Sequence, residues 1–577
     1  MKIVIFSGGT GSVQLQTGLY EVFGKDVLDY TIITNLADNG LSTGVVRKVM
    51  DGEIMGPSDL RKNQMLRAKL EGSCDEDTLA FLDQRITMRA EDVEMYLLTT
   101  IAQLDEGPDS KAILELGVRT FFEQPKALQI DYDDFSVSNI IYAGLARQYG
   151  NSLDIAGEMF ERVLNIPKDS VISNTDQSMY LTATTESGYR IMDEGDIVSW
   201  NNPQDKIVAC SFLDVHGKPV VPVMNGKSLK AIAEADLIIF STGTQWSSLI
   251  PTYISKGFKE AIEASTAPKY LIMNSTEDKD MKGVSGDAIL DILSNYLPLD
   301  TIEILAASNG DPNLIPASNR YKPIIVPLMI DEYSRKHDPR RLVLAIFNHY
   351  YQYQLANDVQ VFDYDDTIVA RGEQFKVVSA SNMRMINDVK GKEVWISTGN
   401  TPKAIKRGFK RINLLADGGV NQYIINEQSD AVFVKCLDEK LIFTNNEIYD
   451  IIKNITNVGI DVSKIQVRGK VMVSIKPIDP AYREPIVILL TSLFPEYNVK
   501  PTGRTTIDIY KHGMSKTVAL DKLTAFFNSF TFAGDEWHEG GNDYEMSLVP
   551  RCRFLKIKDV RDTNMYLRIL TWRSEWN

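Results

Sequence analysis

The sequence predicts an α/β protein with two Rossmann-like, doubly wound domains, the second of which carries an inserted α+β cap. Two observations lead to this prediction. Short apolar runs typical of buried strands recur along the 577 residues, and polar, glycine-bearing loops follow them. Helical patterns lie between these runs, as expected when helices connect parallel strands.

The domain junction is predicted near residues 348–357 (NHYYQYQLAN), a stretch without Gly, Pro or Ser. The first domain is then 1–350 and the second 358–577. In the second, the core is predicted at 358–417 and 511–577 and the cap at 418–510, with strands that include Ala431–Lys435 and Leu441–Phe443. Because a flexible linker would be rich in Gly and Ser, we expect the two domains to pack together.

The first domain opens with a glycine-rich loop. Met1–Phe6 has the pattern of a buried strand, residues 7–12 (SGGTGS) follow at once, and a helical pattern covers Val13–Phe23. Glycines between a strand and a helix allow backbone N–H groups to approach a phosphate. The loop is not a Walker loop, and Gln14 replaces the third glycine of a dinucleotide fingerprint. A phosphate or nucleotide site and a plain tight turn are both open at this point.

Further strands of this domain end in polar loops. Tyr30–Leu36 precedes Asp38 and Asn39, residues 235–240 precede a loop rich in Ser, Thr and Gly, and Lys269–Met273 precedes Asn274. Open parallel sheets bind ligands just past the carboxyl ends of their strands. Asp59, before Leu60, is either a ligand residue or a helix cap.

These loops, with His337-Asp338-Pro339, resemble the family that joins 2-phospho-L-lactate transferase with the gluconeogenesis factor, from Lys2 to about Phe347 and most closely in the second branch. The resemblance implies a Rossmann-like domain for a nucleotide diphosphate conjugate. In the transferase branch, an acceptor hydroxyl attacks the diphosphate with Mg²⁺ and releases a nucleoside monophosphate. In the other branch, the domain binds a nucleotide sugar in a regulatory role.

The same resemblance supplies the candidate residues of the first domain. Those expected to cradle phosphates are Gly8, Gly9, Thr10, Gly11, Ser241, Gly243 and Ser247. Those expected to contact the acceptor or a metal are Asp38, Asn39, Asp59 and Asn274.

The second domain contains residues 363–367 (DYDDT) after the apolar residues Val359, Val361 and Phe362. A DxDxT sequence at the carboxyl end of a strand places one Asp to attack phosphorus and a second Asp to move a proton. A solvated acidic turn is the alternative for this segment taken alone.

Three later segments support the phosphoryl-transfer interpretation. A strand ends in Ser397-Thr398, before a helix start at Pro402 where a phosphate is favoured. Lys516 precedes another helical pattern. A strand then ends before Asp535, followed by Asn542 and Asp543, whose oxygens suit Mg²⁺.

Together these segments resemble the haloacid dehalogenase superfamily, in particular its capped sugar-phosphate phosphatases and its phosphomannomutase branch. The resemblance implies that Asp363 is the nucleophile and Asp365 the general acid/base. Thr398 and Lys516 would hold the phosphoryl oxygens. Mg²⁺ would be held by Asp363, the backbone carbonyl of Asp365 and Asp535, with Asn542 and Asp543 behind them. Asn400 stands where many relatives have Arg. The cap would close over the substrate, and Arg504 is a candidate for gripping its non-reacting part.

Composition excludes several other classes. A net charge of −15 and a pI near 5 argue against a general nucleic-acid binder. No apolar stretch reaches the roughly 18 residues of a membrane span, and the chain starts with a strand rather than a signal peptide. Four widely spaced cysteines suit a reducing compartment and form no zinc motif. We therefore expect a cytoplasmic protein without membrane partners.

The prediction is a bifunctional, Mg²⁺-dependent enzyme. Its first domain would be a transferase acting on a nucleotide-diphosphate-linked phospho-metabolite, and its second a phosphatase of a small phosphorylated metabolite. Two alternatives stay open: the first domain is only a nucleotide-sugar sensor, or the second is a phosphohexomutase. The transferase relatives suggest a homodimer.

Overall fold

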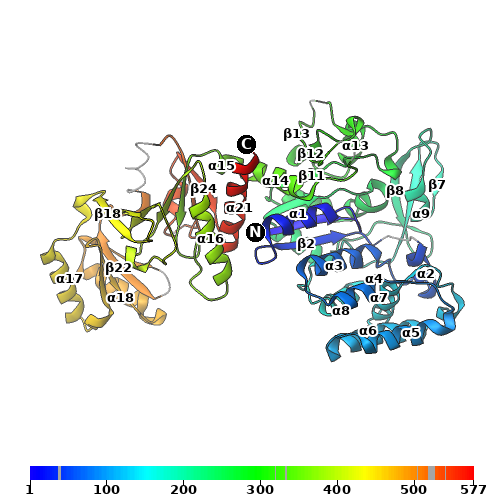
Figure 1. Cartoon of the computed structure of the whole chain (residues 1–577), viewed down its shortest axis with the longest axis horizontal. Helices are drawn as coiled ribbons and strands as arrows, with labels where there is room; N and C mark the ends of the chain where they lie inside the picture. Colours follow the sequence, from blue (N-terminus) through cyan, green and yellow to red (C-terminus); the bar gives the residue numbers. More distant parts are fainter. Residues whose placement is uncertain are drawn as a thin grey trace. The chain divides into compact units, whose positions relative to one another are not determined.

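The computed structural model describes residues 1–36, 41–318, 320–331, 334–502, 505–517, 527–539 and 541–576 (Figure 1). The chain forms two compact units, Met1–Ile346 and Phe347–Asn577. Each is an α/β unit built around a seven-stranded sheet, and the predicted fold class is confirmed. Among the described residues, no helix combines the length and the apolar character needed to cross a membrane.

The sheet of the first unit is parallel throughout, with the order β13-β12-β11-β10-β1-β2-β5. Its strands are β1 (Lys2–Ser7), β2 (Asp29–Thr34), β5 (Val171–Ser173), β10 (Leu237–Phe240), β11 (Lys269–Ile272), β12 (Glu303–Ala307) and β13 (Ile324–Val326). From β1 the sheet continues through β2 to β5 on one side, and from β10 it continues through β11 and β12 to β13 on the other. The strand order therefore reverses between β1 and β10, which is the switch point where such sheets bind ligands.

Helices and a small accessory sheet surround this sheet. The residues of β1 from Ile3 to Ser7 are buried, and Phe6 stacks on Phe240 with ring centroids 5.1 Å apart, as expected of a strand covered on both faces. A helical layer gathers at one end of the unit (Figure 1). The main helices are α1 (Val13–Phe23), α3 (Ser58–Glu71), α5 (Ala90–Gln103), α6 (Pro108–Phe122), α7 (Val137–Gln148), α8 (Leu153–Val163), α10 (Gly226–Glu234), α12 (Phe258–Ala264), α13 (Gly286–Leu293) and α14 (Pro339–Tyr350). The accessory sheet has the order β7-β6-β8-β9, with β6 at Tyr180–Thr185 and β8 at Ile207–Leu213.

Helix α3 is buried although it has no apolar stripe. Arg67 donates to the carbonyl of Tyr30 at 2.7 Å and stands 4.2 Å above the Tyr30 ring, and Tyr142 donates to Gln64 Oε1 at 2.7 Å. Buried polar groups are tolerated when they are hydrogen-bonded. Hydrogen bonds to β2 and α7 thus hold the polar side chains of α3 inside the unit.

The core sheet of the second unit has the order β18-β17-β16-β15-β14-β23-β24. Its strands are β14 (Val359–Asp363), β15 (Glu393–Ser397), β16 (Ile412–Ala416), β17 (Asn421–Ile425), β18 (Ala431–Cys436), β23 (Phe530–Gly534) and β24 (Cys552–Lys556), and its principal helices are α16 (Lys376–Asp388) and α21 (Val560–Trp576). Strand β17 runs antiparallel to its neighbours β16 and β18, and the other neighbouring strands of this sheet pair in parallel.

The cap is a four-stranded antiparallel sheet, β19-β20-β22-β21, with two helices on one face (Figure 1). Its elements are α17 (Asn445–Asn457), β19 (Ile465–Arg468), β20 (Met472–Ile475), α18 (Pro480–Leu493), β21 (Tyr497–Thr502) and β22 (Thr506–Lys511). The predicted strand at Ala431–Lys435 exists, but it pairs with β17 in the core sheet. The strand predicted at Leu441–Phe443 is wrong: Glu439–Leu441 forms a helical turn, which Asp438 caps through Lys440 N at 3.1 Å.

Candidate functional site

Three neighbouring strands bring the predicted catalytic residues of the second unit together. Asp363 is the last residue of β14 and lies opposite Ser397 of β15, and β23 pairs with the other edge of β14. Thr398 and Asp535 are the residues that follow β15 and β23 closely. Because these strands are parallel, all three residues lie at one edge of the sheet.

Lys516 is at the centre of the charged groups at this edge. Its ammonium donates to Asp363 Oδ1 at 2.5 Å, Asp543 Oδ1 at 2.7 Å and Asn542 Oδ1 at 3.0 Å. Lys516, Asp363 and Asp543 are all buried. Burial favours the neutral form of Lys516, but the carboxylates of Asp363 and Asp543 outweigh it and raise the pKa of the lysine. The site therefore holds a fixed positive charge directly beside the predicted nucleophile.

The carboxylates at this edge outnumber the single lysine. Oxygens of Asp363, Asp535 and Asp543 lie within 4.8 Å of one another. Burial raises the pKa of Asp535 to about 6, and the Asp543 charge adds to the effect. Burial also raises the pKa of Asp363, against the opposing effect of Lys516. Three carboxylates, of which Asp363 and Asp543 are buried and Asp535 is partly exposed, stand against one lysine and form a donor set that fits a divalent cation with oxygen ligands.

Asn400 links Asp365 to the turn that follows β15. Its side-chain amide donates to Asp365 Oδ2 at 2.6 Å, and its backbone N–H donates to Thr398 Oγ1 at 3.1 Å. Asp365 is partly exposed, whereas Thr398 is buried. The residue that departs from the family pattern therefore orients the predicted general acid/base.

The sheet of the cap presents a second polar wall that the sequence analysis did not identify. Arg468 approaches the carbonyl of Gly399 at 3.5 Å. Burial and the Arg468 charge lower the pKa of Lys476, while the charges of Asp508 and Asp365 act in the opposite direction. The signal was the alternation in residues 472–476, where Val473 and Ile475 enter the cap core and the residues between them do not.

Two oxygens of this wall are buried. Ser474 and Asp508 are opposite each other on β20 and β22. Both are at least nine-tenths buried, yet Ser474 Oγ and Asp508 Oδ1 have no hydrogen-bond partner among the described residues. Unpaired buried polar atoms are costly unless a ligand or water completes them. Arg504, predicted to act in the cap, lies outside the described residues.

In the first unit, the glycine loop lies at the switch point between β1 and β10. Thr242 Oγ1 donates to the carbonyl of Gly11 at 2.7 Å, and a Cβ on Gly11 would lie 1.8 Å from the carbonyl oxygen of Thr242. A Cβ on Gly9 would lie 2.3 Å from Asp59 Oδ1, and one on Gly8 would lie 2.8 Å from Ser248 Cβ. The glycines are therefore required by close packing against neighbouring loops.

The backbone of this loop keeps donors available. Within the described part of the chain, the N–H groups of residues 9–12, which include Thr10, donate no hydrogen bond. These groups precede α1, whose N-terminus favours an anion. The hydroxyl of Ser241 also has no partner among the described residues, although the residue is 1% exposed. The loop could thus accept a phosphate without breaking existing bonds.

Helix α3 adds a cation that the sequence analysis missed. Lys62 Cδ lies 3.0 Å from the position of a Gly9 Cβ, so this side chain crosses the glycine loop. Asn63 holds the loop by donating to the carbonyl of Gly8 at 3.0 Å. Lys62 follows Asp59 by three residues on one helix face, and that spacing was the available signal.

The remaining candidates of the first unit make contacts within the protein. The N–H of Ser247 donates to Asp280 Oδ2 at 3.0 Å, and its hydroxyl donates to Thr244 Oγ1 at 2.7 Å. Asn274 exchanges two hydrogen bonds with the backbone of Gly243, at 3.1 and 3.0 Å. Asp38 and Asn39 lie outside the described residues.

Comparisons with known proteins match both units. A family model described as 2-phospho-L-lactate transferase CofD matches residues 3–311, and one described as eukaryotic phosphomannomutase matches residues 450–571. A putative gluconeogenesis factor from Thermotoga maritima is 29% identical over 274 residues, which are 48% of this chain and 68% of that protein. The resemblance of each half to its family is thereby confirmed.

Two solved structures are similar to parts of this chain. A crystal structure of a UPF0052 family protein from Bacillus halodurans covers 60% of this chain and 98% of its own, at 21% identity and a TM-score of 0.42. A structure of IMP-nucleotidase from Plasmodium falciparum covers 42% of this chain and 68% of its own, at 16% identity and a TM-score of 0.29.

Proposed function

The chain belongs to the 2-phospho-L-lactate transferase CofD family, and from this premise we propose that it is a bifunctional enzyme. Its second unit would transfer the phosphoryl group of a small phosphorylated metabolite through an aspartyl-phosphate. Its first unit would act on a nucleotide-diphosphate-linked metabolite. The observation that carries the proposal is the contact of Lys516 with Asp363, inside a cluster of three carboxylates at the carboxyl ends of parallel strands.

The first chemical step uses the two aspartates of the DxDxT sequence. A carboxylate oxygen of Asp363 attacks phosphorus, the bond between phosphorus and the ester oxygen breaks, and that oxygen takes the proton of Asp365. Lys516 and the Thr398 hydroxyl bind the phosphoryl oxygens as the bond breaks, because fixed positive charge and hydrogen-bond donors stabilise the charge of the transition state.

In the second step, water attacks the aspartyl-phosphate and Asp365 takes a proton from that water. The bond between phosphorus and Asp363 then breaks, which releases inorganic phosphate and restores both aspartates. Asn400 keeps the Asp365 carboxylate in place through its 2.6 Å hydrogen bond in both steps. Mg²⁺ held by Asp363, Asp535 and Asp543 would neutralise charge on the transferring phosphoryl group.

The polar wall of the cap favours a hydroxylated, anionic substrate. Arg468 and Lys476 supply positive charge beside the reacting end, and the unpaired oxygens of Ser474 and Asp508 suit hydroxyl groups. The same wall supports the alternative reaction, in which a sugar hydroxyl replaces water and the second unit is a phosphohexomutase.

The test is phosphate release from sugar phosphates, phospho-acids and nucleotides with Mg²⁺, comparing wild type with Asp363→Asn. We expect release from at least one compound and a loss of about three orders of magnitude or more in the variant. Release that persists in Asp363→Asn would contradict the aspartyl-phosphate. Movement of phosphate between hydroxyls of one sugar, without release, would identify the mutase.

For the first unit, the available N–H groups of residues 9–12 and the adjacent Lys62 support a diphosphate site. Mixing nucleotide-linked donors with hydroxyl acceptors and Mg²⁺ should yield a nucleoside monophosphate. Binding of a nucleotide sugar without any monophosphate would instead establish a sensor domain.

A further inference from the structure

The loop that follows β10 is fixed by a carboxylate from another loop. It ends in a π-helical turn, Gln245–Leu249, and the first N–H groups of such a turn have no partner inside it. Asp280 accepts these groups. Its Oδ2 accepts from the N–H groups of Trp246 and Ser247, at 2.8 and 3.0 Å, and its Oδ1 accepts from that of Gln245 at 3.3 Å. One side chain therefore satisfies the start of the whole turn.

No basic side chain accompanies this buried carboxylate. Asp280 is 4% exposed. Among the described residues, backbone N–H groups and the Ser247 hydroxyl contact it, and no lysine, arginine or histidine does. Burial raises the pKa of Asp280 to about 6, and the N–H groups of residues 245–247 act in the opposite direction. The turn thus holds a carboxylate of the protein with donors that could otherwise hold a phosphate.

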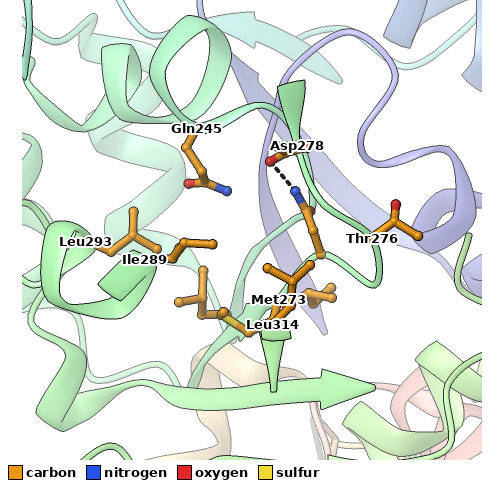
Figure 2. Close-up of a pocket in the computed structure, with 10 residues that line it drawn as sticks. Gln245, Met273, Thr276, Asp278, Ile289, Leu293 and Leu314 are labelled. Atoms are coloured by element: carbon orange, nitrogen blue, oxygen red, sulfur yellow. Dashed lines mark hydrogen bonds between the residues drawn. The ribbon is translucent and has the colours of Figure 1, made fainter. Parts of the chain in front are cut away.

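A second contact fixes the same loop at Gly243. Asn274 donates to the carbonyl of Gly243 at 3.0 Å and accepts from its N–H group at 3.1 Å. Asp278 accepts a hydrogen bond from Asn274 Nδ2 and so orients this amide (Figure 2). The space left beside Gln245 and Asp278 is about 10 Å³, which is room for one water molecule. Residues 274–280, which follow β11, therefore pack closely against the loop after β10 and support it.

The supported loop in turn contacts the glycine loop. Thr242 Oγ1 donates to the carbonyl of Gly11 at 2.7 Å, and the carbonyl oxygen of Thr242 leaves no room for a Cβ on Gly11. A displacement of residues 242–247 would therefore move the backbone of residues 9–12, whose N–H groups are available for a phosphate. A site built from backbone donors depends on their fixed directions.

We propose that Asp280 is a positioning residue of the phosphate site in the first unit. It holds the loop after β10 against the glycine loop and does not touch the ligand. The proposal rests on the nucleotide-binding function proposed above. It gives Ser247 and Asn274 supporting roles as well, because their polar groups already bond to Asp280 and Gly243. The competing explanation is that Asp280 acts only as a negative charge near the site, which would oppose an anionic ligand.

Two substitutions separate the hydrogen bonds of Asp280 from its charge. Asp280→Leu removes both at similar volume, whereas Asp280→Asn removes the charge but keeps one acceptor oxygen for the turn. The measurement is calorimetric titration of the full-length chain with UDP-glucose, GDP-mannose and ADP-ribose, with Mg²⁺ at about pH 8, where Asp280 is ionised.

For the ligand that the wild type binds most tightly, Asp280→Leu should weaken binding at least about tenfold, because the turn loses its acceptors. Asp280→Asn should stay within about threefold of the wild type, since its amide oxygen can still accept from Trp246 and Ser247. Tighter binding by both variants would show that only the charge matters and would overturn the proposal.

Hydrogen exchange of the free protein tests the support without a ligand. The N–H groups of residues 245–247 should exchange at least about tenfold faster in Asp280→Leu than in the wild type. Unchanged exchange would overturn the proposal. Asp214→Leu is the matched control, because Asp214 also accepts two N–H groups, those of His216 and Lys218, but in the turn after β8. It should change neither the exchange of residues 245–247 nor ligand affinity.

Thermal melting confirms that each variant folds. If Asp280→Leu does not fold, Asp280→Ala replaces it, because this variant removes the same acceptors with a smaller side chain. Faster exchange with unchanged ligand affinity would overturn the positioning role and leave the proposed nucleotide binding in place. Failure of the folded wild type to bind any of the three ligands would contradict nucleotide binding itself, and the positioning role with it.

Discussion

The two units place their candidate sites at the same position, the carboxyl edge of a parallel sheet, but build them from different groups. In the second unit the site consists of side chains: Lys516 bonds to Asp363 and Asp543 in a buried cluster. In the first unit it consists mainly of backbone, with N–H groups around Gly11 and close packing against Thr242. Covalent phosphoryl transfer needs a nucleophile and a proton carrier, whereas holding a diphosphate needs donors in the right shape.

This difference indicates which substitutions should inactivate each site. A side-chain site is lost when one functional group is removed. A backbone site is lost when an added atom moves a loop, even if no functional group changes. Four comparisons test this contrast, beginning with the largest expected effect.

Lys516→Met should have the largest effect. Phosphoryl transfer should fall about 10²- to 10³-fold, because the variant loses the cation beside the nucleophile. In EDTA the variant should also lose about 3 kcal/mol of unfolding free energy, because buried carboxylates remain without their partner. Enzyme kinetics and chemical denaturation check the two effects.

The control for this variant is Lys511→Met. Lys511 forms an ion pair with Glu447 on the cap, at 3.0 Å and partly exposed. We expect its unfolding free energy to change by less than about 1 kcal/mol and its phosphoryl-transfer kinetics to stay unaltered. Equal effects of the two variants would show that the Lys516 cluster has no special role.

Gly11→Ala should abolish nucleotide binding without removing any functional group. Its Cβ would lie 1.8 Å from the carbonyl oxygen of Thr242, so the two loops must separate, at a cost of about 1–3 kcal/mol. Gly226→Ala meets no atom within 4 Å and should bind nucleotide as the wild type does. Normal binding by a folded Gly11→Ala would contradict the role of close packing, with nucleotide titration and thermal melting as the measurements.

Lys476→Met should weaken substrate use in the second unit by about tenfold in kcat/KM, mostly through KM, because in the proposed function this cation attracts the anionic substrate and takes no part in breaking the bond. Lys453→Met, on the exposed surface of α17, should have no effect. A fall in kcat alone would place Lys476 in the chemical step instead.

Glu161→Gln should have the smallest effect, which is on the pH dependence of stability. It compares two buried carboxylates with different partners. Unlike Asp363, Glu161 is held by N–H and hydroxyl groups of residues 169–171 rather than by a lysine. Burial raises its pKa to about 7 from a usual value of 4.5. The folded state then binds the proton more tightly, so this residue's contribution to stability is greatest below about pH 4.5 and is lost as the pH rises to about 7.

In Glu161→Gln, the contribution of this residue to the pH dependence of stability should disappear. Thermal melting of wild type and variant between pH 4.5 and 8 is the measurement. An identical slope in both proteins would show that Glu161 does not titrate differently on folding.

Much of the second unit's site was predictable from local sequence. Asp363, Thr398 and Asp535 each follow a recognisable strand, and parallel pairing then requires their proximity. The cap was harder to predict. Ser474 and Asp508 are in strands that α18 and β21 separate along the chain, and only the pairing of β20 with β22 places them opposite each other. The strand predicted at Leu441–Phe443 failed because Asp438 caps a turn there, and that local hydrogen bond outweighs the apolar pattern.

The amino-acid sequence by itself determined the α/β class, the glycine loop after β1 and the order of the phosphoryl-transfer residues, because strand patterns and turn residues act over a few positions. Only the tertiary structure decided that Lys516 bonds to Asp363, 153 residues away, that Lys62 crosses Gly9, and that Gln245 and Asp278 share one pocket. These contacts depend on loop conformations and on packing between distant segments, and no local pattern encodes either.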